Sequence, residues 1–481
     1  SAFSSFTSSA EECCYTLLKS FINGFYSVSA KRNELFYSLV PNKNHHFYFV
    51  ISNKSCIFAA KSKYMEKELF RAIIAENQEY IGRVTLVQRP LDLEEYGNYV
   101  FVGVRQAGKS YLLYQRIQQL LANGVEIENI VYVNFDDERL QGMSVTDLDL
   151  ILQAYHSMYD SQPIFFFDEI QNVEGWANFA RRLANQKYRI YITGSNAKML
   201  SRDIETVLGG RYLDISVFPY SFSEYLKAVG VLLSKNWQYG RKANELQRHF
   251  RTYFDWGGFP ELVHFQEKRV WLNSLYNRIF FNDLVVRHKI KNEDALRLCV
   301  RRLAESVKQP CSLNRLSNLI KATGTSCSPS TVMEYVRYLQ ESCLLISIDN
   351  YVSKFVEKET IKKHYFVDNG LLHLFINNPN TSLLENLCAI TLYKKYGKGL
   401  YYYNRNIEVD FYVPDEGLAV QASYQMSDEE TIEREVKALV ALHGLYPLKR
   451  AMIITYEDEG EIVRDGLKIE IRPAWKWVLE C

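Results

Sequence analysis

A glycine-rich segment, GVRQAGKS (residues 103–110), stands between an apolar run and a run of residues with helical spacing. It matches the pattern G-x-x-x-x-G-K-[ST] at every fixed position, and its place between strand-like and helix-like runs argues against a chance match. Such a loop turns backbone N–H groups inward at a helix N-terminus, where they cradle phosphates. We expect Lys109 to reach the β and γ phosphates and Ser110 to ligate magnesium. The expected nucleotide-binding residues are Gly103, Val104, Arg105, Gln106, Ala107, Gly108, Lys109, Ser110 and Tyr111.

A pair of acidic residues follows a second apolar run. The segment IFFFDE ends on Asp168 and Glu169, so a buried strand would deliver two carboxylates to the sheet edge where ligands of open α/β sheets bind. Asp168 suits the magnesium shell, and Glu169 suits the base that activates water for attack on the γ phosphate. The alternative is an acidic pair that caps the next helix. A kinase would pass the phosphate to a bound hydroxyl, whereas the paired Asp-Glu favours hydrolysis.

Two further segments place polar residues near the same predicted edge. YITGSN ends on Ser195 and Asn196, which could sense the γ phosphate or position the water, or could form a turn that caps a helix. Arg211, in LGGRY, could neutralise transition-state charge within the chain or across a subunit boundary. It could equally be solvated or paired with a carboxylate. The candidate catalytic residues are therefore Glu169, Lys109, Arg211, Ser195 and Asn196.

Strand-like and helix-like runs alternate from about residue 98 to 225. This alternation predicts an α/β fold with a parallel sheet and helices on both faces. The strand-like runs are rich in Val, Ile, Phe and Tyr without polar alternation, as is typical of parallel strands covered on both faces.

The order of motifs along the chain resembles a known family, the prokaryotic AAA-type ATPases that carry an uncharacterised C-terminal domain. The resemblance runs from about Met65 to the C-terminus and rests on VGVRQAGKSYLL, FFFDEIQNVEGWANFARRLA, YITGSNAKMLS, LGGRY, FPYSFSEYL, GGFPELV and HYFVDNGLL. It implies a P-loop core, a helical region, a winged helix and a C-terminal α/β module. It also implies ATP rather than GTP as the nucleotide, and no established physiological role.

The expected domains follow these changes of pattern. They are a P-loop AAA-type ATPase core at 65–225, a helical lid at 226–290, a winged-helix domain at 291–370 and a restriction-endonuclease-like domain at 371–481. Residues 1–64 lack both aspartate and methionine and keep no regular period. We expect an upstream extension there, with Met65 as the natural start, and a small accessory domain is the alternative.

The segment 291–370 predicts three helices followed by a strand pair, with Ser328 as a helix cap. To read DNA, the third helix would need several Arg, Lys, Asn or Gln side chains on its exposed face. It offers Thr331, Arg337 and Gln340 beside two glutamates. We therefore expect packing or protein contact rather than sequence-specific DNA reading.

The segment 371–481 resembles a nuclease core that has lost part of its site. Glu385, Glu408 and Asp410 are possible metal ligands, but Gln421 and Ser423 stand where an acidic residue and a lysine are expected. One ligand and the cation that would stabilise the attacking hydroxide are thus missing. We expect a degenerate scaffold without cleavage activity.

Composition limits the remaining possibilities. The formal net charge is +1, so no global field favours nucleic acid or an anionic membrane. The sequence has no apolar run of about 18 residues, and its nine scattered cysteines suit reduced thiols; we expect a cytoplasmic protein. The predicted function is Mg-ATP hydrolysis that drives the C-terminal domains. The alternative is a slow nucleotide-gated switch with an unknown protein partner, in either case with a DNA-linked variant and an undetermined oligomeric state.

Overall fold

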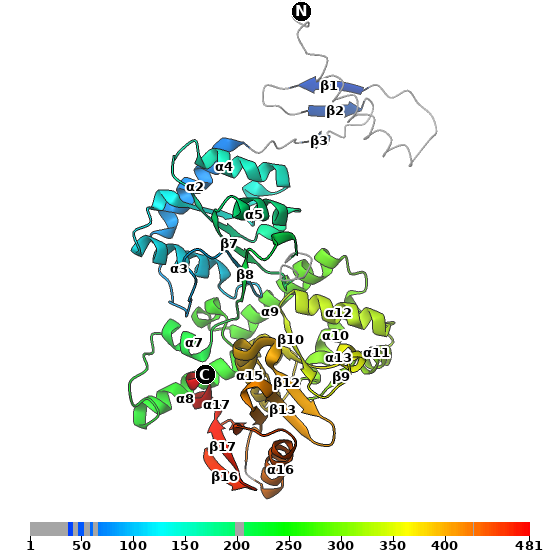
Figure 1. Ribbon diagram of the computed structural model, residues 1–481. Coiled ribbons are helices and arrows are strands. Elements are labelled where there is room, and N and C mark those ends of the chain that lie inside the picture. The colour runs from blue at the N-terminus through cyan, green and yellow to red at the C-terminus, as the bar shows by residue number, and fades with distance from the viewer. Residues whose placement is uncertain (1–36, 42–46, 52–57, 61–65, 198–205, 427) are drawn as a thin grey trace, which may run out of the picture. The chain divides into compact units, whose positions relative to one another are not determined.

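The computed structural model describes residues 37–41, 47–51, 58–60, 66–197, 206–426 and 428–481 (Figure 1). The chain divides into two compact units, residues 1–65 and 66–481. In the first unit, β1 (Tyr37–Pro41), β2 (Phe47–Ile51) and β3 (Phe58–Ala60) form an antiparallel sheet in that order. The remainder of the expected N-terminal extension lies outside the described residues.

A five-stranded parallel sheet forms the first part of the second unit. Its strands are β4 (Tyr99–Val102), β5 (Ile130–Asn134), β6 (Ile164–Asp168), β7 (Arg189–Gly194) and β8 (Leu213–Ser216). The order across the sheet is β5-β6-β7-β4-β8, and every neighbouring pair is parallel. The predicted α/β class with a parallel sheet is thus confirmed.

Helix α2 (Lys67–Ile81) precedes this sheet. The helices α3 (Lys109–Ala122), α4 (Asp149–Tyr155) and α5 (Trp176–Asn185) connect its strands. From β4 the chain crosses through α3 to the edge strand β5, and then returns through α4 and α5 toward β7. Right-handed crossovers, as is usual in parallel sheets, place α3 on one face and α4 and α5 on the other. The connections that leave the neighbouring strands β4 and β7 run in opposite directions across the sheet, so a ligand-binding crevice lies at the carboxyl ends of these two strands.

A helical region follows the sheet. It contains α7 (Phe222–Ala228), α8 (Gly240–Trp256), α9 (Lys268–Arg278) and a π-helix, η7 (Ile279–Val286), which continues α9 without a break.

Short 3-10 turns occur in several parts of the chain, at η1 (Ile127–Asn129), η2 (Glu138–Leu140), η3 (Val145–Leu148), η4 (Ile170–Asn172), η6 (Pro260–His264), η8 (Gly397–Gly399) and η9 (Pro414–Glu416). Across the described ranges, no helix is both long and apolar enough to cross a membrane.

Four helices and three strands come next. The elements are α10 (Glu293–Glu305), β9 (Cys311–Ser312), α11 (Leu313–Lys321), α12 (Pro329–Glu341), β10 (Leu345–Asn350), α13 (Phe355–Thr360) and β11 (Ile361–Phe366). The predicted cap of the third helix is confirmed, because the Ser328 side chain accepts a hydrogen bond from the Thr331 N–H. β10 and β11 are antiparallel, and β9 pairs with β11.

The last part of the chain extends this strand pair into a larger sheet. Its elements are α14 (Asn369–His373), α15 (Asn380–Tyr396), β12 (Tyr401–Asn404), β13 (Glu408–Val413), β14 (Leu418–Ala422), α16 (Glu429–Leu445), β15 (Arg450–Thr455), β16 (Gly460–Arg464), β17 (Leu467–Pro473) and α17 (Ala474–Glu480). The nine strands follow the order β16-β17-β15-β14-β13-β12-β10-β11-β9, from red to yellow in Figure 1. Because Asp349 of β10 pairs in parallel with Tyr401 of β12, one sheet crosses the boundary expected at residue 370.

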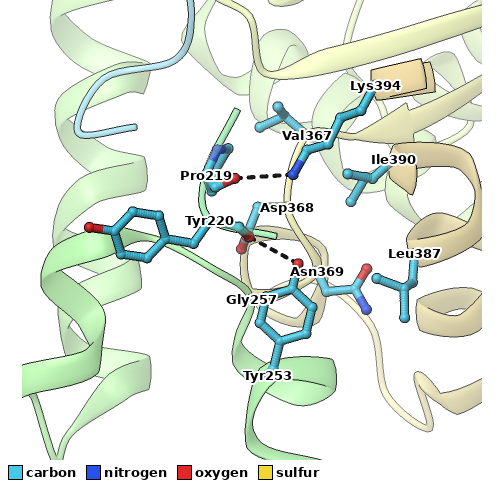
Figure 2. Close-up of a pocket in the computed structure, with 10 residues that line it drawn as sticks. All are labelled: Pro219, Tyr220, Tyr253, Gly257, Val367, Asp368, Asn369, Leu387, Ile390 and Lys394. Atoms are coloured by element: carbon cyan, nitrogen blue, oxygen red, sulfur yellow. Dashed lines mark hydrogen bonds between the residues drawn. The ribbon is translucent and has the colours of Figure 1, made fainter. Parts of the chain in front are cut away.

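A compact junction ties the helical region to both sheets (Figure 2). The Gly258 N–H donates to Asp368 Oδ2 at 2.8 Å, and the Tyr220 N–H donates to the Gly258 carbonyl at 2.7 Å. The Lys394 ammonium donates to the Pro219 carbonyl at 3.1 Å. Segments far apart in the sequence thus share hydrogen bonds around the Gly257-Gly258 turn.

Substitution of Gly258 tests this junction. A Cβ atom there would lie 2.1 Å from the Tyr220 carbonyl oxygen, so Gly258→Ala must break the backbone contact. We expect a loss of stability of about 1–3 kcal/mol, measured as a lower Tm in thermal unfolding. The matched control is Gly444→Ala at the end of α16, where a Cβ meets no atom within 4 Å and alanine is the better helix former. Equal Tm values for the two variants would contradict the interpretation.

Candidate functional site

The glycine-rich loop leaves β4 and enters α3 through a backbone that only particular residues can adopt. A side chain at Gly103 would lie 2.0 Å from the Val217 carbonyl oxygen, so the loop packs directly on the segment that follows β8. Gly108, the N-cap of α3, has φ +93°, and Gln106 also has a left-handed φ of +60°. Left-handed backbone at such positions turns successive N–H groups into a concavity at a helix N-terminus. The loop therefore fits a polyphosphate.

The side chain of Lys109 lies over this loop. It is 4% exposed, and its ammonium donates to the carbonyls of Gly103 at 3.1 Å and Val104 at 3.2 Å. The same nitrogen lies 3.3 Å from Glu169 Oε1. The two motifs that were singled out separately in the sequence thus meet in one ion pair.

Asp168 ends β6 and is buried beside the loop. Its Oδ2 accepts a hydrogen bond from the Tyr132 hydroxyl at 2.6 Å, and its Oδ1 accepts one from Thr193. Burial and the neighbouring charge of Glu169 raise the pKa of Asp168, while hydrogen bonds from Ser110, Thr193 and Tyr132 oppose the rise. Ser110 and Asp168 therefore lie together as a hydroxyl and a carboxylate.

Oxygen donors of this type are those that magnesium prefers. Within the part of the chain that the structure describes, no group of three or more His, Cys, Asp or Glu side chains could hold a metal ion. Magnesium usually takes only one or two protein ligands and completes its shell with water and substrate phosphates, so Ser110 and Asp168 fit that pattern.

Glu169 is held in a strained conformation. Its φ of +52° and ψ of 40° are left-handed, which is uncommon for a residue other than glycine and often marks a functional site. Its Oε2 accepts from Gln171 Nε2 at 2.5 Å and from the Ser195 N–H at 3.2 Å. Burial alone would raise the pKa of Glu169, but the Lys109 ammonium and the Gln171 hydrogen bond outweigh burial, and its pKa lies below the ordinary value. The carboxylate is therefore ionised at neutral pH.

Gln171 is a residue that the sequence analysis missed. Its Nε2 contacts Glu169, as above, and lies 3.5 Å from Ser195 Oγ. Its Oε1 is buried and has no hydrogen-bond partner among the described residues. Ser195 and Asn196 are both buried at the same sheet edge, as expected from the strand that precedes them. The signal for Gln171 was its position two residues after Glu169, on the turn that carries the carboxylate.

Arg211 is not brought to this site within the chain. It precedes β8, and its carbonyl accepts from the Asn98 side chain at 3.3 Å, just before β4. Since β4 and β8 are parallel, both of these positions lie at the amino edge of the sheet, opposite the loop. The Arg211 side chain is exposed and contacts the Gly209 carbonyl. The expectation of an arginine beside the phosphates in the same chain is wrong, and a role across a subunit boundary stays a prediction.

The remaining loop residues have different environments. Val104 and Ala107 are fully buried in the core, whereas the Tyr111 side chain is 52% exposed on α3. Gln106 Nε2 lies 3.5 Å from Glu261 Oε2. The Arg105 side chain is partly exposed and binds Asp283 of the π-helix, with 2.5 Å between Nε and Oδ2.

A second cluster of charges lies in the C-terminal sheet. The Lys363 ammonium, on β11, is completely buried and lies 3.0 Å from Asp410 Oδ1, 3.2 Å from Glu385 Oε1 and 3.3 Å from Glu408 Oε1. Burial opposes the charge of Lys363, but the three carboxylates outweigh it and raise the pKa of the lysine. Burial and Asp410 raise the pKa of Glu385 to about 7. The possible metal ligands of the nuclease-like region are thus closed around a lysine.

This lysine was missed because it precedes the segment that was compared with a nuclease core. At the expected ligand position, Gln421 accepts from the Asp410 N–H at 2.8 Å and donates to the Glu408 carbonyl at 3.1 Å. Ser423 donates to the Gln425 carbonyl at 3.2 Å. Gln421 therefore fixes the strands, and the positive charge comes from β11.

Comparison with known families places an AAA domain over the first site. Residues 95–226 match the family AAA_14, described as an AAA domain. Residues 247–382 match the family DUF8612, described as a domain of unknown function. The match to this second family carries no description as a winged helix or a nuclease.

Relatives of the whole chain also exist. The uncharacterised protein MJ1544 of Methanocaldococcus jannaschii is 31% identical over 443 residues, which are 88% of this chain and 98% of that protein. An uncharacterised protein of Haemophilus influenzae is 29% identical over 394 residues, which are 79% of this chain and 94% of that protein. Among solved structures, the Walker-type ATPase PABY2304 of Pyrococcus abyssi has a TM-score of 0.39 and 12% identity, over 66% of this chain and 97% of that one.

Replacement of Lys363 tests the charge cluster. Lys363→Met leaves three carboxylates without their cation, and we expect a loss of about 3–5 kcal/mol in unfolding free energy. Burial and Asp410 raise the folded-state pKa of Glu385 to about 7, and Lys363 opposes this rise. Removal of Lys363 raises the pKa further, so the folded variant binds more protons than the folded wild type and loses more stability as the pH rises. The difference from wild type should therefore grow from pH 5 to pH 8 in thermal unfolding.

The matched control is Lys362→Met on the same strand, whose partner Asp349 lies 3.1 Å away in a more exposed pair. We expect it to cost less than about 1 kcal/mol. A Lys363 variant that unfolds like this control at pH 8 would contradict the assignment.

Proposed function

Because the chain belongs to the same family as the uncharacterised protein MJ1544 of Methanocaldococcus jannaschii and its residues 95–226 match an AAA domain, we propose that it binds ATP with magnesium and hydrolyses it. The AAA domain supports nucleotide binding and hydrolysis in general. The observation that carries the specific proposal is the 3.3 Å contact between Lys109 Nζ and Glu169 Oε1 beside the Ser110–Asp168 pair. It brings a phosphate-binding cation, a carboxylate base and oxygen donors for a metal together at one sheet edge.

In the proposed mechanism, the loop 103–108 binds the phosphates through its backbone N–H groups. The Lys109 ammonium leaves Glu169 for the β and γ phosphates, which are the stronger partners for a cation. Ser110 and Asp168 would hold magnesium, which would neutralise charge on the phosphates. Glu169, no longer paired with Lys109, is then free to accept a proton from water.

Two side chains orient that water. The Glu169 carboxylate accepts its proton, and the Gln171 Oε1 offers a buried acceptor that is still unused. The Ser195 N–H keeps Glu169 in position, and Asn196 follows on the same strand end. Gln171 is thus a positioning residue, because it acts on the water through its amide and on the base through Nε2.

The second candidate function is a nucleotide-gated switch that turns ATP over slowly. The observation in its favour is that Lys109, Gln171 and Ser195 all engage the Glu169 carboxylate. A base held by three groups must be released before it can act, and slow release gives long-lived nucleotide states. A protein partner would then recognise the nucleotide-bound form.

We propose the domain boundaries 65–225, 226–290, 291–370 and 371–481 as functional regions. The helices α10 to α12 with β9 to β11 suit a winged helix used for packing. Each of the three side chains that the third helix offers for DNA reading has a partner within the chain: Thr331 contacts Ser328 Oγ at 2.9 Å, Gln340 contacts Ser347 at 2.8 Å and Arg337 lies 3.7 Å from Glu341. The cluster around Lys363 supports a degenerate, non-cleaving nuclease-like scaffold.

Phosphate release from ATP with magnesium tests the main proposal. We expect Glu169→Gln to lower kcat by about 10²- to 10⁴-fold while nucleotide binding survives, and Lys109→Ala to weaken ATP binding by about tenfold or more. Glu174→Gln, an exposed glutamate on the same segment, is the control. Nucleotide binding without turnover in the wild type would favour the switch, and stimulation by duplex DNA would favour a nucleic-acid-linked role.

The role of Gln171 has its own test. Gln171→Leu removes the amide that contacts water and base, so we expect kcat to fall about 10- to 100-fold with little change in KM. Gln171→Asn, which keeps an amide, should restore part of the rate. Gln162→Leu, at an exposed glutamine before β6, serves as the control. A parallel change in KM and Tm would indicate a merely structural role.

A further inference from the structure

Arg105, in the phosphate-binding loop, is held by a residue far along the chain. Its Nε lies 2.5 Å from Asp283 Oδ2, and its Nη2 lies 3.0 Å from Asp283 Oδ1. The Asp283 side chain is 2% exposed, and Arg287 Nη2 also lies 3.0 Å from its Oδ1. One buried carboxylate is therefore shared by two guanidinium groups, and it holds the arginine of the loop.

Asp283 lies within the π-helix Ile279–Val286. Such segments are rare, because the wider turn has poorer geometry, and they occur frequently at functional sites. The segment follows directly on α9, so the two form one continuous helix whose last part changes from α-helical to π-helical geometry. An α-helical alternative of the same segment would move Asp283 around the helix axis, because the residues per turn would differ.

The π-helix also contacts the three-helix region. The Arg297 guanidinium of α10 lies 4.0 Å from the centre of the Phe280 ring. Just after the π-helix, the His288 ring stacks on Tyr338 of α12 with centroids 3.8 Å apart. The segment that holds Arg105 thus packs on α10, and its end packs on α12.

A nucleoside triphosphate competes with Asp283 for Arg105. Guanidinium groups bind phosphate oxygens in a bidentate manner, as they bind carboxylates. A triphosphate in the loop carries several negative charges against the single charge of Asp283. The Asp136 carboxylate, 3.9 Å from Arg105 Nη1, is too distant for a hydrogen bond. Arg287 remains paired with Asp283 when Arg105 leaves, which limits the free-energy cost of leaving a buried carboxylate with one partner fewer.

We propose that Arg105 is a nucleotide sensor: a bound triphosphate draws its guanidinium from Asp283, frees the π-helix from the loop and passes the nucleotide state to α10 and α12. This inference rests on the proposed nucleotide binding at the same loop and deepens it by naming the route to the C-terminal region. A ligand shifts a conformational equilibrium only if it interacts differently with the two conformations. The triphosphate meets this condition, because it replaces Asp283 as the partner of Arg105 in one conformation only.

Hydrogen exchange of the full chain tests the sensor. Exchange of residues 279–288 is measured without nucleotide, with ADP and with a non-hydrolysable ATP analogue, each with magnesium, and nucleotide affinity is measured by calorimetry. In the wild type we expect the analogue to accelerate exchange in this segment more than ADP does. Asp283→Asn should show fast exchange without nucleotide and bind the analogue about fivefold tighter or more. Arg105→Gln lacks the same contact, so it should also show fast exchange without nucleotide, bind the analogue more weakly than the wild type, and show no further change in exchange when the analogue binds.

Asp149→Asn is the matched control, since it alters an aspartate that pairs with Arg182 on the exposed surface. It should change neither affinity nor exchange at 279–288. The wild-type comparison alone decides the matter even if Asp283→Asn does not fold. Binding of the analogue with unaltered exchange at 279–288 would overturn the sensor while leaving the ATP site intact. Absence of any nucleotide binding would overturn both proposals.

Discussion

The turn from β4 into α3 depends on two positions that cannot carry a side chain in their present conformation. Gly103 lies against the Val217 carbonyl, and Gly108 caps α3 with a left-handed φ. Because the loop packs so closely on the segment after β8, the start of α3 is fixed relative to the sheet. That in turn fixes the base of the Lys109 side chain and lets its ammonium reach Glu169 at the end of β6, which is separated from β4 by β7. A loop with larger residues would separate the cation from the carboxylates.

Compensation of buried charge is the second theme of the structure. Lys109 is satisfied by two carbonyls and Glu169, and Asp168 is satisfied by hydroxyl groups. Asp283 and Lys363 extend the same principle to the π-helix and to the C-terminal sheet. An isolated buried charge costs several kcal/mol, so each of these groups is paired in the folded structure with groups that compensate its charge. In the proposed ATPase cycle, these partners are exchanged rather than lost, which makes nucleotide binding able to alter contacts elsewhere.

The C-terminal half is bound into one structure by its sheet and by the Gly257-Gly258 junction. β10 and β11 belong to the winged-helix-like region, yet they continue into β12 and the following strands. Lys363 of β11 reaches Asp410 of β13 within that sheet. The two regions therefore share a core and a charge cluster, and a movement that starts at the π-helix would be transmitted to them as a unit rather than to a freely hinged module.

The sequence alone determined the features that depend on short spacing. The loop 103–110, the Asp168-Glu169 pair and the parallel sheet were all predicted, because a strand, its following turn and its carboxyl-end residues are contiguous in the chain. The prediction for Arg211 within the chain was wrong because this residue precedes its strand, whereas the phosphate-binding loop follows its strand. In a parallel sheet these two positions lie at opposite edges. Gln171 was missed because its orphan acceptor is visible only in three dimensions. Asp283 lies 178 residues from Arg105, and Lys363 lies 47 residues from Asp410. Only tertiary packing decided these pairs, because many acidic residues of the chain could form an ion pair with either cation. The folded structure buries one particular carboxylate beside each of them.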